Sequence, residues 1–271
     1  MKMLSTIVAT LAFASMANAA DLPLKAAPPA PIAAPTWTGW YVGINGGGVW
    51  GNNDPSLLVS PNGYFIPGNV PAVQAAGSQS FSSSGGLVGG QIGYLAQWGS
   101  IIGGVEAGFD WMGLSGSSAT GAVYPVQGCV QVAGCAFTLN NSVHTDWLFT
   151  FLGRVGVDMG SWFPYITGGL AVSNLKYSVA FADNNLGINA NTAASFSDTK
   201  AGFAIGGGVE WRFDPSWMLR GEYLYVQFDS VNGTTPALTS LVAAFPATTN
   251  YVVSSGTFKE NIGRAALSYR F

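Results

Sequence analysis

Few residues in this sequence are of the types that carry out catalysis. The only histidine, His144, is followed by Thr145 and Asp146, where a polar stretch enters an apolar segment. A lipid hydrolase with a Ser-His-Asp triad would need such a histidine at an extracellular rim. A single histidine beside an aspartate is far more often an ordinary surface residue, so we expect no catalytic residue and no enzyme activity.

Carboxylates and glycine-rich runs are the other candidates for chemistry. Glu106 and Asp110 are four residues apart on one strand face, which separates them by about 13 Å at the usual rise per residue. That spacing is too wide for two carboxylates that share a proton. Gly46–Gly48 and Gly206–Gly208 are followed by no helix pattern and no Lys-Ser pair, so we do not expect phosphate binding.

The two cysteines, Cys129 and Cys135, lie in a glycine-containing stretch of a chain whose N-terminal residues, described below, predict export. A local disulfide between them is the natural interpretation for an exported protein, and a pair of free thiols is the alternative. No His, Asp or Glu lies within five residues of either cysteine, so a metal site is not expected. We expect no cofactor.

The first thirty-six residues predict export followed by a linker. A basic start (MKM, residues 1–3), an apolar stretch over about residues 4–16 and the small-x-small site ANA predict a signal peptide over residues 1–19. Residues 20–36 are rich in Pro and Ala and have no period, which predicts a periplasmic tether. The remaining residues, 37–271, form the predicted structured domain.

The composition of the chain is unusual for a soluble protein. It contains 37 Gly, 13% aromatic residues and only 8% charged residues, whereas roughly a quarter of an ordinary soluble domain is charged. Residues 20–271 contain no apolar run long enough for a transmembrane helix, so the composition suggests a membrane β-barrel. A net charge of -3 and the lack of any basic block make nucleic acid an improbable partner.

Eight segments of the predicted domain alternate with period two. From Ile101 to Trp111 the odd positions are apolar or glycine, whereas the even positions include Glu106 and Asp110. A basic residue that faces lipid near the midplane costs roughly 2–4 kcal/mol, so the charged face of each segment must point away from lipid. A soluble sandwich would also alternate, so this pattern alone does not establish a membrane protein.

Aromatic residues and the links between segments favour the membrane. The aromatic residues gather near one set of segment ends, at Trp40, Trp98, Trp162, Phe163, Trp211, Trp217 and Phe271, and near the opposite ends, at Trp50, Trp111 and Trp147. Two such belts anchor a protein at two membrane surfaces. The links alternate between four long ones, over about 52–84, 113–144, 174–198 and 229–260, and three short ones near Gly99, Gly160 and Asp214.

Four long and three short links require eight strands, with both chain ends on the side of the short turns. The sequence therefore predicts an all-β fold: an eight-stranded antiparallel up-and-down transmembrane β-barrel with four long extracellular loops and three short periplasmic turns. An even number of strands lets the last strand pair with the first, which leaves no unsatisfied edge in hydrocarbon.

The inward-facing positions of the predicted strands carry both signs of charge. These predicted interior charges are Glu106, Asp110, Asp146, Arg154, Glu210, Arg212, Arg220, Glu222, Arg264 and Arg270. Eight strands enclose a lumen that side chains just fill, so a plug of ion pairs is the leading hypothesis and a charge-lined conduit is the alternative. Removal of one partner from such a pair would leave a buried charge, at a cost of roughly 3–5 kcal/mol.

Short motifs along residues 37–271 resemble one family. They are WTGWYVG at 37–43, GGQIGY at 89–94, GGVE at 103–106, GRVG at 153–156, YITGGLA at 165–171, GGGVEW at 206–211 and EYLYV at 222–226. In this order and spacing they resemble the small outer-membrane β-barrel surface antigens of alphaproteobacteria, also called porin-family or outer-membrane immunogenic proteins. The final residues, with Tyr269 and Phe271, resemble the C-terminal signal read by the outer-membrane assembly machinery; Ala266 departs from it, where glycine is usual.

The resemblance implies a location in the bacterial outer membrane and a non-catalytic role in envelope integrity and surface interactions. A narrow porin-like channel for small solutes is the alternative. The implied partners are outer-membrane lipid and lipopolysaccharide, the assembly machinery during insertion, and host molecules or phage at the loops, and we expect a monomer. Some members of the family are described as haemin-binding, which would here require ligation by His144, a Tyr or a Met.

Overall fold

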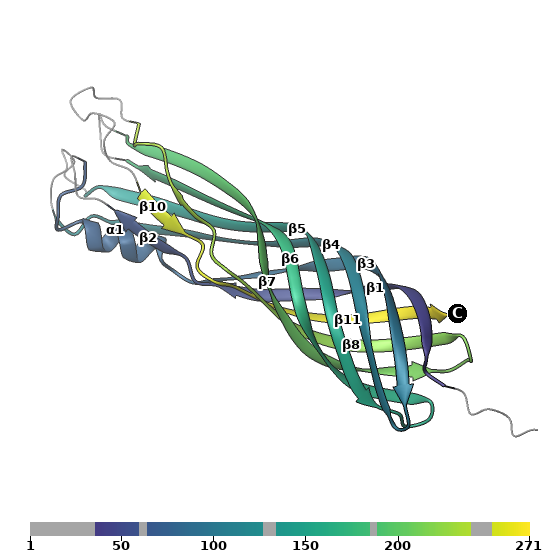
Figure 1. The fold of residues 1–271 in the computed structure, drawn as a ribbon. Coiled ribbons are helices and arrows are strands. Elements are labelled where there is room, and N and C mark those ends of the chain that lie inside the picture. Colours follow the sequence, from purple (N-terminus) through teal and green to yellow (C-terminus); the bar gives the residue numbers. More distant parts are fainter. Residues whose placement is uncertain (1–35, 60–63, 127–133, 185–188, 240–250) are drawn as a thin grey trace, which may run out of the picture. The chain divides into compact units, whose positions relative to one another are not determined.

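The computed structural model describes residues 36–59, 64–126, 134–184, 189–239 and 251–271. Residues Thr36–Phe271 form one compact unit, in which eight long strands pair into a closed barrel, drawn as a ribbon in Figure 1. These strands are β1 (Gly39–Asn53), β3 (Phe81–Trp98), β4 (Ile101–Val123), β5 (Ala136–Val157), β6 (Trp162–Asp183), β7 (Asn191–Arg212), β8 (Trp217–Phe228) and β11 (Phe258–Arg270). None of the helices in the described part of the chain could cross a membrane.

The ring of strands closes through β1. One edge of β1 pairs with β3 and the other with β11, where the antiparallel register runs from Tyr41 opposite Arg270 to Asn52 opposite Lys259. Every other strand pairs with its two neighbours in the ring, so the membrane-embedded part has no open edge. This confirms the predicted antiparallel eight-stranded barrel.

Two of the short turns depend on glycine. Gly99 has a φ of 63° and joins β3 to β4, and Gly160 has a φ of 77° and joins β5 to β6. Residues with a side chain rarely adopt such left-handed backbone angles, whereas glycine adopts them without steric cost. At the third short turn, between β7 and β8, the Asp214 carboxylate accepts a hydrogen bond from the Ser216 amide at 3.0 Å.

Four strands continue well beyond the ring on the side of the long links. The pairing of β3 with β4 ends where Ser84 faces Ser115, but β4 continues to Val123. In the same way, β8 ends where Phe228 faces Gly202 of β7, but β7 already begins at Asn191. The upper halves of β4, β5, β6 and β7 therefore form a four-stranded sheet, here called the extension. Much of residues 113–144 and 174–198, which were predicted as loops, is strand in the structure.

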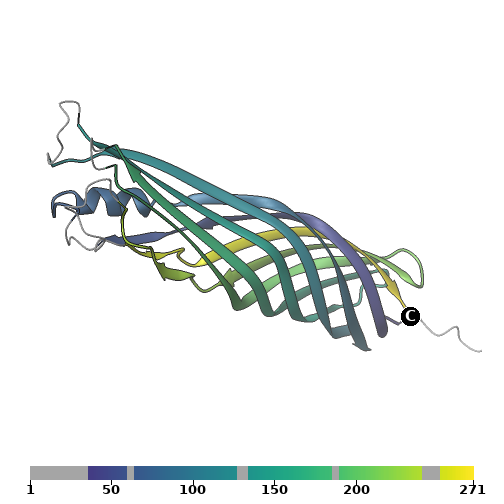
Figure 2. The ribbon, with the colours of Figure 1, turned by 90° about the horizontal axis from the view of Figure 1, so that it is seen from above.

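A small cap packs against the extension. It consists of β2 (Ser56–Val59), the helix α1 (Val70–Gly77), β9 (Asn232–Thr234) and β10 (Tyr251–Ser254), and its strands pair in the order β2-β10-β9. In Figures 1 and 2, α1, β2 and β10 lie together at the end away from the C-terminus. Buried side chains of the cap and the extension form one apolar cluster that includes Leu57, Phe65, Phe137, Val179, Phe181, Tyr251 and Val253.

The outer surface of the ring is apolar. Ile44, Val88, Ile166, Leu170 and Ile205 are each more than half exposed on this surface, as lipid-facing side chains must be. All but one of the aromatic residues assigned to the belt at the ends near the short turns are exposed. The exception is Phe163, which is fully buried beside Trp37 with ring centroids 5.5 Å apart, so its placement in the lipid-facing belt was wrong.

We predict that Leu170→Arg destabilises the barrel folded in lipid bilayers, lowering its free energy of unfolding by about 2–4 kcal/mol, because Leu170 faces lipid between the two belts. Ser195→Arg is the matched control, since Ser195 is exposed on the extension and should tolerate a charge. Urea titration of folding into vesicles measures both values. Equal losses in the two variants would contradict the assignment of hydrocarbon to the ring alone.

Candidate functional site

The charged residues inside the ring form a network centred on Glu106. Its carboxylate accepts hydrogen bonds from Arg220 and, at 2.6 Å, from the Tyr41 hydroxyl. The Arg154 Nη1 atom lies 3.4 Å from Glu106 Oε2 and donates to the Tyr41 oxygen at 2.8 Å. The Arg264 Nη2 atom lies 3.5 Å from Glu106 Oε1. One carboxylate from β4 therefore contacts three guanidinium groups, which come from β5, β8 and β11.

Arg264 extends the network toward two further carboxylates. Its Nη1 atom donates to Asp110 at 3.1 Å, and its Nε atom donates to Glu222 at 2.7 Å. The Tyr165 hydroxyl donates to Glu222 at 2.5 Å from β6. These contacts connect opposite parts of the barrel wall across the lumen, because the residues come from β4, β6, β8 and β11.

Arg154 completes the network. Its Nη2 atom donates to Glu210 of β7 at 2.7 Å, and its guanidinium carbon lies 4.0 Å from the centre of the Tyr165 ring. In each ion pair of the network the side chains are at most 1% exposed. Charges buried to this extent persist only when they are paired, and here four carboxylates face three guanidinium groups.

Glycines on the inner face provide the space for these long side chains. A Cβ atom at Gly93 would lie 2.3 Å from the Tyr41 hydroxyl oxygen, and one at Gly208 would lie 2.7 Å from the Tyr165 hydroxyl oxygen. Both distances are too short for non-bonded atoms. The glycines of the inner face therefore leave the room that the long side chains of the network occupy.

The lumen is closed a second time above the network. Buried apolar side chains fill this level from the inner faces of the ring, among them Val49, Leu87, Met112, Leu224 and Ile262, and they are continuous with the apolar cluster of the cap. Burial raises the pKa of Tyr177 and of Tyr251 well above the ordinary value. Both hydroxyls therefore stay protonated, and they add no charge to this layer.

Glu260 of β11 is the exception within this layer. The residue is 1% exposed, and neither of its carboxylate oxygens has a hydrogen-bond partner among the described residues. A buried polar group without a partner costs free energy. Glu260 was not among the predicted interior charges, although its position opposite Gly51 of β1 gives it the same inward direction as Arg264.

The periplasmic mouth is closed around Trp37. This side chain is fully buried, its Nε1 atom donates to Asp158 at 3.0 Å, and the Arg212 guanidinium carbon lies 4.5 Å from its ring centre. Arg212 donates to the Thr36 carbonyl at 3.0 Å, and Arg270 donates to the same carbonyl. Two of the predicted interior charges, Arg212 and Arg270, therefore bind backbone carbonyls at this mouth and lie outside the ion-pair network.

The family model described as the outer membrane protein beta-barrel domain matches residues 6–271 of this chain. The chain belongs to this family. A 31 kDa outer-membrane immunogenic protein of Brucella melitensis is 35% identical over 243 residues, covering 85% of this chain and 89% of that protein. The family and this relative confirm the predicted resemblance and a location in the bacterial outer membrane.

Two solved structures of outer-membrane proteins also match this chain, both with TM-scores below 0.5. The outer membrane protease OmpT from Escherichia coli is 9% identical with a TM-score of 0.45, over 86% of this chain and 97% of that chain. The outer membrane protein OprG from Pseudomonas aeruginosa is 13% identical with a TM-score of 0.35, over 86% and 96%.

Asp146 does not face the lumen of this outer-membrane barrel, and its assignment as an interior charge was wrong. Its side chain is 40% exposed, its carboxylate lies 2.7 Å from the His144 imidazole, and it forms an ion pair with Lys176 at 2.5 Å. The physical reason is an irregularity in β5, where the register shifts between Thr145 and Leu148. Buried positions are odd-numbered before this shift and even-numbered after it.

The remaining predicted sites are the two cysteines and the C-terminal residues. Cys135 is fully buried and is not a free thiol, but Cys129 lies outside the described residues, so the disulfide stays a prediction. Tyr269 packs edge-on against Trp217 and Phe271 on the outer face. Recognition of these C-terminal residues by the assembly machinery stays a prediction.

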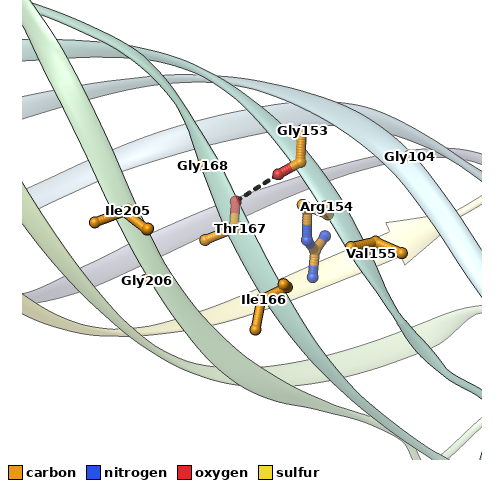
Figure 3. A pocket seen from close by; sticks show the side chains of 9 residues that line it. All are labelled: Gly104, Gly153, Arg154, Val155, Ile166, Thr167, Gly168, Ile205 and Gly206. Atoms are coloured by element: carbon orange, nitrogen blue, oxygen red, sulfur yellow. Dashed lines mark hydrogen bonds between the residues drawn. The ribbon is translucent and has the colours of Figure 1, made fainter.

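A groove on the lipid-facing wall offers little polar chemistry (Figure 3). It has a volume of about 520 Å³. Val155, Ile166 and Ile205 line it together with four glycines, Gly104, Gly153, Gly168 and Gly206. Its polar lining is limited to Thr167, whose hydroxyl donates to the Gly153 carbonyl at 2.9 Å, and to Arg154, which is paired in the lumen. This groove therefore forms part of the membrane-facing surface.

We predict that Glu106→Gln destabilises the barrel by about 3–5 kcal/mol, because the amide leaves buried guanidinium groups without their shared charge. Asp146→Asn, at an exposed ion pair, should cost at most about 1 kcal/mol. Chemical unfolding in detergent measures both variants. Similar small losses would show that the network contributes little to stability.

Glu260→Met should have the opposite sign. Because the Glu260 carboxylate is buried without a partner, we expect its replacement by an apolar side chain of similar length to stabilise the barrel by about 1–3 kcal/mol. The same unfolding experiment measures the change. Destabilisation by more than about 1 kcal/mol would indicate that the carboxylate has a favourable role.

Proposed function

We propose that this protein is a non-catalytic, surface-exposed barrel of the outer membrane that does not conduct solutes. The observation that carries this proposal is the double closure of the lumen, by a buried ion-pair network and by an apolar layer continuous with the cap. We expect the protein to contribute to envelope integrity and to contacts at the cell surface.

The network favours a plug over a conduit. A solute that crossed the lumen would have to separate Glu106 from its guanidinium partners and then displace the apolar side chains above it. Breaking one buried ion pair costs several kcal/mol, and the pairs here share members, so several would break together. An eight-stranded barrel has no spare width through which a solute could bypass them.

The extension supports the surface role. Its outward face carries a row of serines across four strands, since Ser117 faces Ser142, Ser142 faces Ser178 and Ser178 faces Ser195. These small polar side chains suit contact with water on the extracellular side, whereas the inner face of the same strands is apolar. The Brucella melitensis relative is named an outer-membrane immunogenic protein, which agrees with display of such a surface to a host.

The surroundings of His144 support a role without catalysis. In the described part of the chain its imidazole bonds to Asp146, and the same carboxylate also binds Lys176. A hydrolytic triad would need a serine hydroxyl on the imidazole, and none of the described serines makes that hydrogen bond. His144 and Asp146 therefore fit better as part of a polar surface cluster.

Permeability of reconstituted vesicles tests the proposal. We expect vesicles that contain the full mature chain to take up sugars at the rate of empty vesicles, and planar bilayers to show no stepwise conductance, because both layers of the plug stay closed. A general porin reconstituted in the same way provides the positive control. Sugar uptake above the empty-vesicle rate, with conductance changed by Glu106→Gln, would instead establish the narrow channel.

A further inference from the structure

Two β-bulges coincide at the extracellular belt of the barrel. β4 has two residues, Met112 and Gly113, where β5 has only Asp146. β5 in turn has two residues, Asp146 and Trp147, where β6 has only Asn174. A bulge interrupts the ladder of backbone hydrogen bonds and redirects a side chain. Here the result is that Asp146 and Trp147 both lie on the outer side of the wall.

The redirected carboxylate joins a polar cluster of Asp146, His144 and Lys176. Asp146 Oδ1 lies 2.7 Å from His144 Nε2, and Asp146 Oδ2 lies 2.5 Å from Lys176 Nζ. His144 and Lys176 are direct cross-strand neighbours. All three side chains are 40–49% exposed, so the cluster presents an ammonium group, an imidazole and a carboxylate to its surroundings.

Asp146 is the member of this cluster that also lines a groove of about 520 Å³ in the wall formed by β3 and β4. Val88 and Trp111 form the walls of the groove. Gly86 and Gly113 also line it and leave backbone exposed where other residues would place side chains. Val88 and Trp111 are 61% and 65% exposed, so the groove opens outward, toward the lipid.

Surface ion pairs alone do not account for this arrangement. An exposed pair contributes at most about 1 kcal/mol and needs no change of register. Without the irregularity in β5, Asp146 would continue the even-numbered, inward-facing series of Leu148 and Thr150. The two bulges instead place a carboxylate on the outer wall, beside a lysine and next to an apolar groove.

We infer that this cluster and groove form a docking site for a phosphorylated glycolipid of the outer leaflet. Trp111 and Trp147 belong to the extracellular aromatic belt, so the cluster next to them lies at the depth of lipid headgroups. Lys176 can donate to a phosphate, whereas Asp146 can accept hydrogen bonds from sugar hydroxyls. The groove accommodates the apolar part of the lipid nearest the headgroup.

The mixture of donors and an acceptor favours a phosphorylated sugar over a simple phosphate. A site for phosphate alone would be weakened by the Asp146 carboxylate, because like charges repel. A sugar that carries both hydroxyls and phosphate can satisfy both kinds of group. Lipid binding at this site on the outer wall is independent of whether the lumen conducts.

Lipid titration of the full mature chain in detergent, followed by native mass spectrometry, tests the site. The probe is lipid A, and dephosphorylated lipid A and phosphatidylglycerol are compared with it. We expect Lys176→Gln to weaken lipid A binding about tenfold, as the loss of one charge-assisted hydrogen bond implies. Lys259→Gln is the matched control, because Lys259 is an exposed lysine at the extracellular end of β11.

Two further results are expected if the site is correct. Dephosphorylated lipid A should bind the unaltered chain more weakly, and Lys176→Gln should not weaken that binding further. Equal loss in the Lys176 and Lys259 variants would overturn the site, and so would equal binding of phosphatidylglycerol with the same dependence on Lys176. A heat-dependent shift on gels shows that each variant is folded, and the conductance experiment tests the plug separately.

Discussion

Hydrocarbon admits neither charges nor unpaired backbone groups, and the rest of this structure depends on that constraint. The pairing of β1 with β11 removes the last open edge, and the alternation of each strand then sends its charged side chains into the lumen. Because the lumen of eight strands is narrow, those side chains must contact one another. The ion-pair network around Glu106 is the consequence of that confinement.

Polar and apolar packing are separated along the lumen. The periplasmic mouth is closed around Trp37, the ion pairs lie above it, and an apolar layer leads into the cap. The outer face of the extension lies outside the membrane and contacts water. The upper halves of β4 to β7 therefore reverse the pattern of the ring, with polar residues outside and apolar residues inside.

The bulges in β4 and β5 lie where these two patterns meet. At that level the outer wall changes from lipid-facing to water-facing, and a charged side chain on it becomes tolerable. Asp146 is directed outward at this boundary, next to the belt residue Trp147, and it pairs with Lys176. Strict alternation along β5 predicted an inward charge at this position. The bulge turns the side chain outward, so a surface cluster forms instead.

The sequence by itself determined the fold class, the eight strands of the ring and the inward direction of residues such as Glu106, Arg154 and Arg264, because a period of two in a membrane allows few other arrangements. Only the tertiary structure decided which charges meet, because partners such as Asp110 and Arg264 come from strands that are distant in the sequence. Only the tertiary structure showed the bulges, because register depends on the neighbouring strands. The extension was taken for loops because its polar outer face resembles loop composition, and the cap that buries its apolar inner face comes from distant segments.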